Sequence, residues 1–220
     1  MSGAAKTHDN AGGRLRLVGP DEAADLGAYL ERLLRFDKAA AVRVVAADSA
    51  VGVYGRPPFE VLTLRTLRLT TPATFDVTLS AGQLLDGIGS DGTVQVPAPL
   101  VGATKWTGFL PPRAGWSPVG TSTVSVVSTA ALKGIGEFKE RAEAIPDSER
   151  TRAAVDAIAA DIWDRPLDHG LPLRAAHAAR AMAFLGPTQA AEVGVSASGR
   201  WLRLDAPFGI VVLRTGSGLL

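Results

Sequence analysis

A leucine pattern near the amino terminus predicts the clearest helix in the chain. The apolar positions recur every three or four residues and so fall on one side of a helix, with charged residues opposite. They are Leu26, Leu30, Leu33 and Leu34. Gly19 and Pro20 interrupt the preceding segment, and we expect the Asp21 carboxylate to cap the first turn. The pattern predicts a helix over residues 21–37.

Alternation of apolar and polar residues predicts strands on both sides of this helix. Residues 14–18 alternate before it, and two short apolar runs after it flank the turn Asp48-Ser49, which predicts a β-hairpin. Two prolines then interrupt pairing, because proline cannot donate a backbone hydrogen bond to a neighbouring strand. Residues 59–69 resume the alternation, so the element order is β-α-β-β-β.

A strand followed by a capped short helix is predicted twice in the middle of the chain. Residues 76–80 alternate, and Ser80 and Gln83 have the spacing of a capping box, in which each side chain bonds an exposed backbone amide. The helix that follows is expected to end at Gly89. Residues 123–136 repeat this pattern. They predict a strand over 123–127, a cap at Ser128 or Thr129, and a helix end at Gly134-Ile135-Gly136.

Two stretches near the ends of the chain resemble each other, which indicates an internal duplication. Pro58-Phe59 aligns with Pro207-Phe208, and the helical pattern over 21–37 aligns with an alanine-rich pattern over 173–185. The sequence therefore predicts an α+β fold with a mainly antiparallel sheet and a pseudo-twofold duplication of a helix–β-hairpin unit. The remaining predicted elements are a helix over 150–164 and strands over 201–203 and 208–215.

The predicted organisation has two halves joined by an irregular crossover. The segment between the halves is rich in proline and tryptophan, and its composition differs from that of a flexible Gly/Ser linker. Short polar or glycine-rich tails are expected at both ends. The parts are a disordered tail over 1–13, a half over 14–96, the crossover over 97–121, a half over 122–215 and a tail over 216–220.

One family resemblance rests on the order of elements in the first half. Strand, helix and three strands, followed by Asp76-Val-Thr-Leu-Ser-Ala-Gly-Gln-Leu-Leu85 and a short helix, is similar in topology to sliding-clamp domains. The similarity covers residues 14–96, whereas the helix-rich stretch over 129–185 departs from it. The resemblance implies a clamp-like fold, and topology alone does not confer function.

Charge and composition narrow the classes of function. A formal net charge of +1 gives no electrostatic reason to bind nucleic acid or an anionic membrane. The absence of cysteine removes disulfides, thiolate nucleophiles and cysteine-based zinc sites. No apolar run approaches the roughly 20 residues that span a bilayer, and the amino terminus lacks the apolar core of a signal peptide. We therefore expect a cytoplasmic protein that does not insert into membranes.

The sequence contains no recognisable catalytic or cofactor motif. There is no phosphate-binding G-x-x-x-x-G-K-[ST] loop and no G-x-G-x-x-G after a predicted strand. The stretch around Ser196 misses the nucleophile-elbow pattern by one residue and falls in a predicted hairpin. His169 and His177 have carboxylates nearby, but prolines interrupt the segment and the paired H-x-x-x-H spacing is missing. We therefore expect no metal and no cofactor, and favour a protein without catalytic activity.

Aromatic and cationic residues gather in the predicted crossover. Exposed tryptophans beside arginine or lysine make good anchors for a protein partner, through large buried area and cation–π contacts. The alternative is that the tryptophans pack the crossover onto the sheet. The candidate partner-binding residues are Lys105, Trp106, Phe109, Arg113 and Trp116.

Arg65 and Arg214 occupy equivalent positions in the two aligned copies, each inside an apolar strand. A charge in such a strand needs a partner or a solvent-exposed face, so the two arginines are candidate contacts to an anion or another ligand. His177 is a further candidate for such a contact. Alternatively, the arginines lie on a solvent face or protect an edge strand.

The leading hypothesis for function is a protein-interaction or adaptor module that binds another protein or itself. The alternative is a small-molecule-binding protein or enzyme with a cleft between the two halves.

Overall fold

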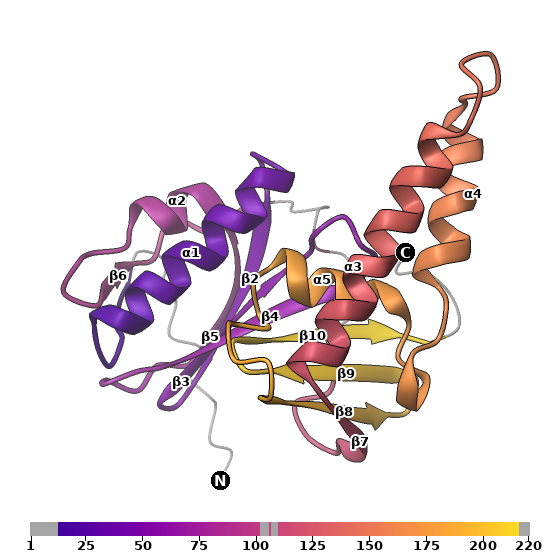
Figure 1. Cartoon of the computed structure of the whole chain (residues 1–220). Helices are drawn as coiled ribbons and strands as arrows, with labels where there is room; N and C mark the ends of the chain where they lie inside the picture. Colours follow the sequence, from indigo (N-terminus) through magenta and orange to yellow (C-terminus); the bar gives the residue numbers. More distant parts are fainter. Residues whose placement is uncertain (1–12, 102–105, 107–109, 216–220) are drawn as a thin grey trace, which may run out of the picture. The chain divides into compact units, whose positions relative to one another are not determined.

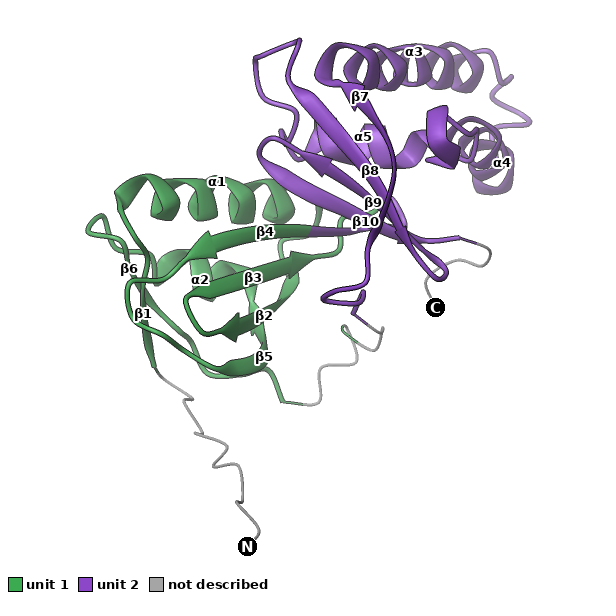
Figure 2. Cartoon of the chain, turned by 90° about the horizontal axis from the view of Figure 1, so that it is seen from below, with its two compact units in different colours: residues 1–58, 64–109 green, residues 59–63, 110–220 purple. Residues whose placement is uncertain are grey.

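The computed structural model describes residues 13–101, 106 and 110–215, and the chain divides into two compact units (Figure 2). Unit 1 comprises residues 1–58 and 64–109, and unit 2 comprises residues 59–63 and 110–220. Each combines helices with an antiparallel sheet, so the predicted α+β class is confirmed. In each unit a helix is followed by a β-hairpin, as the sequence predicted.

Unit 1 is built on a sheet with the strand order β5-β2-β3-β4, and α1 lies over one face of it (Figure 2). Its strands are β2 (Ala41–Ala47), β3 (Ala50–Gly55), β4 (Leu62–Arg68) and β5 (Phe75–Ser80). Helix α1 (Pro20–Phe36) buries Leu26, Leu30 and Leu33 of its leucine stripe. Gly55 permits the close approach of helix and sheet, because a Cβ there would lie 2.5 Å from Leu33 Cδ1.

The start of α1 differs from the prediction, because Asp21 is not its cap. The helix begins at Pro20, and Gly19 occupies the capping position without a side-chain hydrogen bond. Proline suits this first position, since its missing N–H would have no partner inside the helix. Glu22 ties the first turn to the sheet by accepting hydrogen bonds from the backbone N–H of Arg68 at 2.5 Å and from its Nε at 2.9 Å.

Two further local predictions for unit 1 match the structure, the hairpin and the cap at Ser80. The helix after Ser80 ends at Asp86 with Gly87 as its C-cap, so the predicted end at Gly89 is wrong. The β2–β3 hairpin places Ala47 opposite Ala50, and Asp48 has the positive φ of 52° that a tight turn requires. Ser80 Oγ accepts a hydrogen bond from Gln83 N at 3.4 Å, and it caps α2 (Ala81–Asp86) as predicted. The strand predicted over 14–18 is β1 (Arg14–Arg16), which pairs with β6 (Thr93–Gln95) in a separate two-stranded sheet.

Unit 2 has a sheet with the strand order β10-β9-β8-β7, and α3 and α5 lie on one face of it (Figures 1 and 2). The strands are β7 (Ser117–Thr123), β8 (Glu192–Ser198), β9 (Trp201–Ala206) and β10 (Gly209–Arg214). The helical elements are α3 (Val124–Glu143), α4 (Arg152–Trp163), the 3-10 turn η2 (Asp168–Gly170) and α5 (Leu173–Ala181). Helix α5 packs against both β10 and α3.

The predicted strand and short helix over residues 123–136 are wrong. The strand is β7, which ends at Thr123, and Thr123 Oγ1 accepts a hydrogen bond from Val126 N at 3.4 Å as the helix cap. Helix α3 then runs through Gly134 and Gly136 instead of ending there. Gly134 is buried against neighbouring elements, so it serves the contact between helices and not the end of one.

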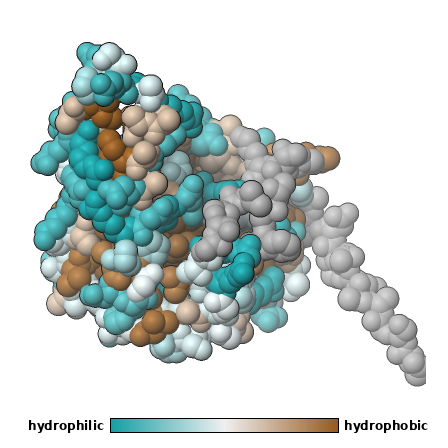
Figure 3. All heavy atoms as spheres, turned by 90° about the vertical axis from the view of Figure 1, so that its right-hand side faces the viewer, coloured by the Kyte–Doolittle hydropathy of each residue, from teal (hydrophilic) through white to brown (hydrophobic). Residues whose placement is uncertain are grey.

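Charged side chains hold α4 against α3, because α4 contributes little to the core. Only Ile162 of α4 is buried, and its other apolar residues are half-buried or exposed. Arg165 donates two hydrogen bonds to Glu137, at 2.6 and 2.7 Å, and these hold the pKa of that carboxyl below its usual range. In Figure 3 the α3–α4 hairpin stands at the top, and hydrophilic and hydrophobic residues are mixed on its surface.

We predict opposite effects for alanine at the two glycines of α3. A Cβ on Gly134 would lie 2.8 Å from Leu173 Cδ2 and 2.9 Å from Trp163 Cζ3, whereas a Cβ on Gly136 would meet nothing within 4 Å. Gly136→Ala should stabilise the chain by about 0.5–1 kcal/mol, because alanine favours the helix. Gly134→Ala should be the less stable variant by about 1–3 kcal/mol, the usual cost of overpacking.

Urea denaturation of the two variants and the parent chain measures this difference. Gly136→Ala is the matched control, since it makes the same chemical change two residues further along the same helix. Equal stabilisation by both substitutions would show that the contact at Gly134 is not close.

Candidate functional site

The face of the unit 2 sheet that points away from the helices carries an aromatic and charged surface. Trp201, Arg203 and Asp205 alternate along β9 with the buried Leu202 and Leu204. Leu204 lies opposite Val195, which lines a cavity beside α3, so the leucines face the helices. The alternation therefore places Trp201, Arg203 and Asp205 on the other face.

Trp116 lies against this face and is fixed by two contacts. Its indole Nε1 donates a hydrogen bond to the Pro112 carbonyl oxygen at 2.9 Å, and the Arg203 guanidinium lies 5.1 Å from the ring centroid. Asp205 accepts both guanidinium hydrogen bonds of Arg203, each at 2.8 Å. The orientation of Arg203 over the indole is thus held from two sides.

A second arginine and tryptophan pair joins β9 to the neighbouring strand β10. Arg214 of β10 is directly opposite Trp201 in the antiparallel register, and its guanidinium lies 5.6 Å from the indole centroid. In the described part of the chain Arg214 has no carboxylate partner, so its donors stay available. We call this surface the Trp–Arg face; its residues are Trp116, Trp201, Arg203, Asp205 and Arg214.

Ser196 is an unusual polar residue of the same face, opposite Arg203. It is 8% exposed, and its Oγ is the one buried side-chain polar atom without a hydrogen-bond partner in the described ranges. Its place in the middle of β8 also confirms that the Gly194–Ser198 stretch is a strand and not a nucleophile elbow.

The partner-binding residues predicted from the sequence separate into three groups. Lys105 and Phe109 lie outside the described residues. Trp106 is only 9% exposed, so its ring is enclosed by protein. Arg113 is exposed and Trp116 is half-buried on the Trp–Arg face. The segment therefore contains both a packing and a surface tryptophan.

Sequence reasoning missed three members of the Trp–Arg face, Trp201, Arg203 and Asp205. The signal was present, since the alternation Trp-Leu-Arg-Leu-Asp over residues 201–205 places the polar and aromatic residues on one side of a strand. Its relation to Trp116 could not be read from the sequence, because Trp116 is reached only through the pairing of β7 with β8 and of β8 with β9.

Arg65 and Arg214 have different environments in the structure. Arg65 of β4 forms an ion pair with Asp25 of α1, and its side chain is 15% exposed. It therefore ties helix to sheet inside unit 1, whereas Arg214 is exposed on the sheet face of unit 2. Their equivalent positions in the sequence did not lead to equivalent chemistry.

His177 of α5 is held between two aromatic rings. Its imidazole stacks on Trp163 with 4.3 Å between the centroids, and Phe59 lies 4.7 Å away in a tilted arrangement. Burial lowers the pKa of His177, because a charged imidazole would lose its hydration in this apolar setting. The ring is therefore neutral at physiological pH.

Two other polar residues of unit 2, Arg174 and His169, are held by partners of their own. Arg174 is paired with both Glu60 and Asp164, and its side chain is 16% exposed. His169 Nε2 lies 3.2 Å from the Thr121 carbonyl oxygen of β7. Across the residues that the structure describes, no three histidine or carboxylate side chains gather as metal ligands.

The edge strand β7 is poorly suited to pairing with another chain. Pro118 lacks a backbone N–H, and the register shifts between Pro118 and Gly120, as it does at a β-bulge. The His169 ring also lies against Gly120, where a Cβ would come within 2.2 Å of it. These are the usual means by which natural proteins protect a sheet edge.

Two family models match the chain, and both describe domains of unknown function. Residues 10–108 match the model described as Domain of unknown function (DUF8010), and residues 111–218 match Domain of unknown function (DUF8185). The boundary between the matches coincides with the boundary of the two compact units after residue 109. None of the curated proteins matches the chain.

Solved structures similar to this chain are bacterial sliding clamps. The chain is similar to the DNA polymerase sliding clamp of Pseudomonas aeruginosa, with a TM-score of 0.51 and 12% identity over 94% of this chain and 65% of that one. For the DnaN sliding clamp of Bartonella birtlesii the TM-score is 0.52 and the identity is 12%, over 94% of this chain and 66% of that one. For DNA polymerase III subunit beta of Borrelia burgdorferi the TM-score is 0.52 and the identity is 7%, over 94% of this chain and 65% of that one.

These similarities show the fold alone, and they confirm the clamp-like topology predicted from the order of elements. They also cover 94% of the chain, so the expectation that the resemblance ends at residue 96 is wrong. The chain spans about two thirds of the length of these clamps, 65–66%.

No helix in the described ranges has the length and apolar character needed to cross a membrane.

We predict that the two tryptophans of the crossover differ in their effect on stability. Trp106→Ala should cost about 3–5 kcal/mol, the usual range for a large buried aromatic. Trp116→Ala should cost clearly less, because the ring is half-buried and its best contact is a cation–π pair worth about 0.5–1 kcal/mol. Urea denaturation measures both. An equal loss in the two variants would assign Trp116 to the core.

We also predict that His177 titrates below its ordinary pKa of 6.5. Because the folded pKa is lowered, the stability from the neutral ring is complete above the unfolded pKa and is lost as the pH falls through the folded pKa. Imidazole NMR resonances, assigned with a His177→Gln variant, give the midpoint. Urea midpoints at about pH 7.5 and about pH 5 should differ less in the variant than in the parent chain. A midpoint at or above 6.5 would contradict the burial argument.

Proposed function

We propose that this chain is a protein-interaction module and that its partner is another protein, which docks on the Trp–Arg face of unit 2. One observation carries the proposal. Two tryptophans and two arginines lie together on one face of a sheet, stacked in pairs and half-buried or exposed. Tryptophan and arginine are the residues most enriched among those that dominate binding energy in protein interfaces.

The contacts within the face favour binding because they fix the side chains in advance. Trp116 is held by its hydrogen bond to Pro112, and Arg203 is held by Asp205, so little side-chain freedom is left to lose on association. Arg214 differs, since its guanidinium lies 5.6 Å from the Trp201 ring centroid and has no ion pair with a described residue. Its guanidinium is placed to bind a carboxylate of the partner through two parallel hydrogen bonds.

Docking through side chains is favoured over the addition of a strand to the sheet. Addition of a strand needs free backbone groups along an edge, and Pro118 and the bulge beside it interrupt that row in β7. In unit 1 the edge strand β5 is partly occupied, because Thr78 O already accepts a hydrogen bond from Leu100 N. The Trp–Arg face is the better supported docking surface.

Charge and fold support a protein partner over nucleic acid. The formal net charge is +1, and the Arg203 guanidinium of the face is neutralised by Asp205 of the same strand. The similar sliding clamps are named for a DNA polymerase, which is itself a protein. A clamp-like fold that docks a protein is consistent with both observations.

The proposal is tested by capture and then by affinity. The chain is immobilised, proteins bound from its native host are identified by mass spectrometry, and the strongest partner is purified for calorimetry. Trp116→Ala and Arg214→Ala should each weaken its binding by about 2 kcal/mol, which is about thirtyfold. Arg152→Ala is the control, because Arg152 is a 94% exposed arginine on α4, remote from the sheet face.

Urea denaturation of the same variants shows whether they remain folded. The proposal is overturned if a partner binds Trp116→Ala and Arg214→Ala as tightly as the parent chain. It is also overturned if Arg152→Ala weakens binding as much as they do, since the effect would then reflect total charge.

A further inference from the structure

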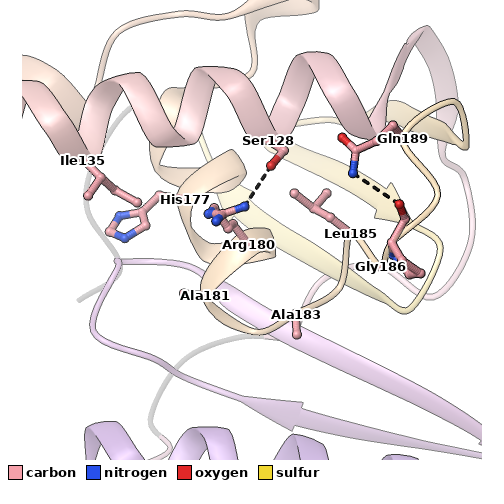
Figure 4. A pocket seen from close by; sticks show the side chains of 10 residues that line it. Ser128, Ile135, His177, Arg180, Ala181, Ala183, Leu185, Gly186 and Gln189 are labelled. Carbon is pink, nitrogen blue, oxygen red and sulfur yellow. Dashed lines mark hydrogen bonds between the residues drawn. The ribbon is translucent and has the colours of Figure 1, made fainter.

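A concave site lies on the helical side of unit 2, away from the Trp–Arg face. It is a pocket of about 560 Å³ between α3, α5 and the segment that leads from α5 to β8 (Figure 4). This volume is within the range of about 300–1,000 Å³ that is usual for small-molecule sites. Its polar lining residues are Ser128, His177, Arg180 and Gln189.

Arg180 supplies a positive charge to this pocket that no carboxylate neutralises. Its Nη1 donates a hydrogen bond to Ser128 Oγ at 2.9 Å, as the dashed line in Figure 4 shows. Among the described residues no carboxylate lies within ion-pair distance of it. This distinguishes Arg180 from Arg165 and Arg174 of the same unit, each of which is paired with two carboxylates.

Ser128 orients the guanidinium and leaves most of its donors free. A guanidinium carries five N–H donors in a rigid plane, and the bond to Ser128 uses one of them. The remaining donors can bind the oxygens of a carboxylate or a phosphate in pairs.

His177 adds a hydrogen-bonding group at one end of the pocket. Its ring is fixed by Trp163 and Phe59, yet neither ring nitrogen has a hydrogen-bond partner among the described residues. The neutral imidazole therefore offers one donor and one acceptor to a molecule in the pocket.

The rest of the lining is apolar and has a shape fixed by the backbone. Ile135 is 37% exposed and lies beside His177 in Figure 4, and Leu185 lies between Arg180 and Gln189. The wall turns sharply after α5, where Ala183 and Gly186 have positive φ angles of 58° and 67°. Gly186 is required there, because a Cβ would lie 2.3 Å from the Phe208 ring.

We propose that this pocket binds a small organic anion. Its carboxylate or phosphate head would pair with Arg180 beside Ser128, and its apolar body would lie along Ile135 and Leu185. A polar group on that body would hydrogen-bond to His177. This ligand site is separate from the docking of a protein on the Trp–Arg face, and neither proposal depends on the other.

Calorimetry with matched probes tests the head group. Octanoate, octyl phosphate and octylammonium share one apolar body, so both anions should bind at least about tenfold more tightly than the cation. Tighter binding of octanoate identifies a carboxylate site, and tighter binding of octyl phosphate identifies a phosphate site. Inorganic phosphate should bind at least about tenfold more weakly than octyl phosphate, because it lacks the apolar body.

Two variants separate the pocket from general charge effects. Arg180→Gln keeps the stem and a hydrogen-bonding end but removes the charge, and it should weaken both anions about tenfold or more. Arg200→Gln is the matched control, because Arg200 is an exposed arginine of the β8–β9 turn without an ion pair in the described ranges, and it should leave affinity unchanged.

Amide NMR on the parent chain provides a test that needs no variant. Octanoate should shift the resonances of Ser128, Arg180 and Leu185 before those of the Trp–Arg face. The proposal is overturned if octylammonium binds as tightly as the anions, if Arg180→Gln binds them like the parent chain, or if the shifts cluster elsewhere. Equal binding of inorganic and octyl phosphate would overturn the role of the apolar wall.

Discussion

The close contact of α5 with its neighbours is the constraint on which unit 2 depends. Four alanines of this helix have no exposed surface, and Gly134 of α3 has no room for a side chain beside Leu173. Small residues let helices and sheet approach closely, so one short helix fills the space between α3 and β10. The larger residues of α5, His177 and Arg180, are thereby directed to its remaining sides, where they line the pocket.

Arginine is used in three different ways in this chain, and each use follows from its nearest partner. Arg165 and Arg174 join segments through carboxylates, and this charge network holds α4 where apolar burial is scarce. Arg203 and Arg214 lie over indole rings and build a surface. Arg180 donates a hydrogen bond to a hydroxyl, and within the described ranges it has no carboxylate partner. The near-zero net charge of the chain conceals these local differences.

Unit 2 thus presents two chemically different surfaces on opposite sides of its sheet. The helix-free face is aromatic and fixed by internal contacts, which suits a protein partner. The helical side contains a concave pocket lined by Arg180, which no carboxylate of the described part of the chain neutralises, and this suits a small anion. The clamp-like fold accounts for the arrangement of helices on one face of the sheet and not on the other, while the particular residues supply the chemistry.

Local sequence determined those features whose causes lie within a few residues. The leucine stripe of α1, the turn at Asp48 and the cap at Ser80 were all predictable, because spacing and turn chemistry act over one or two turns. Tertiary contacts decided the rest. Gly134 reads as a helix end in the sequence but is a packing position, since Trp163 and Leu173 approach it from other helices. Trp106 and Trp116 have similar surroundings in the sequence and different burial in the structure, and only strand pairing brings Trp116 to Arg203.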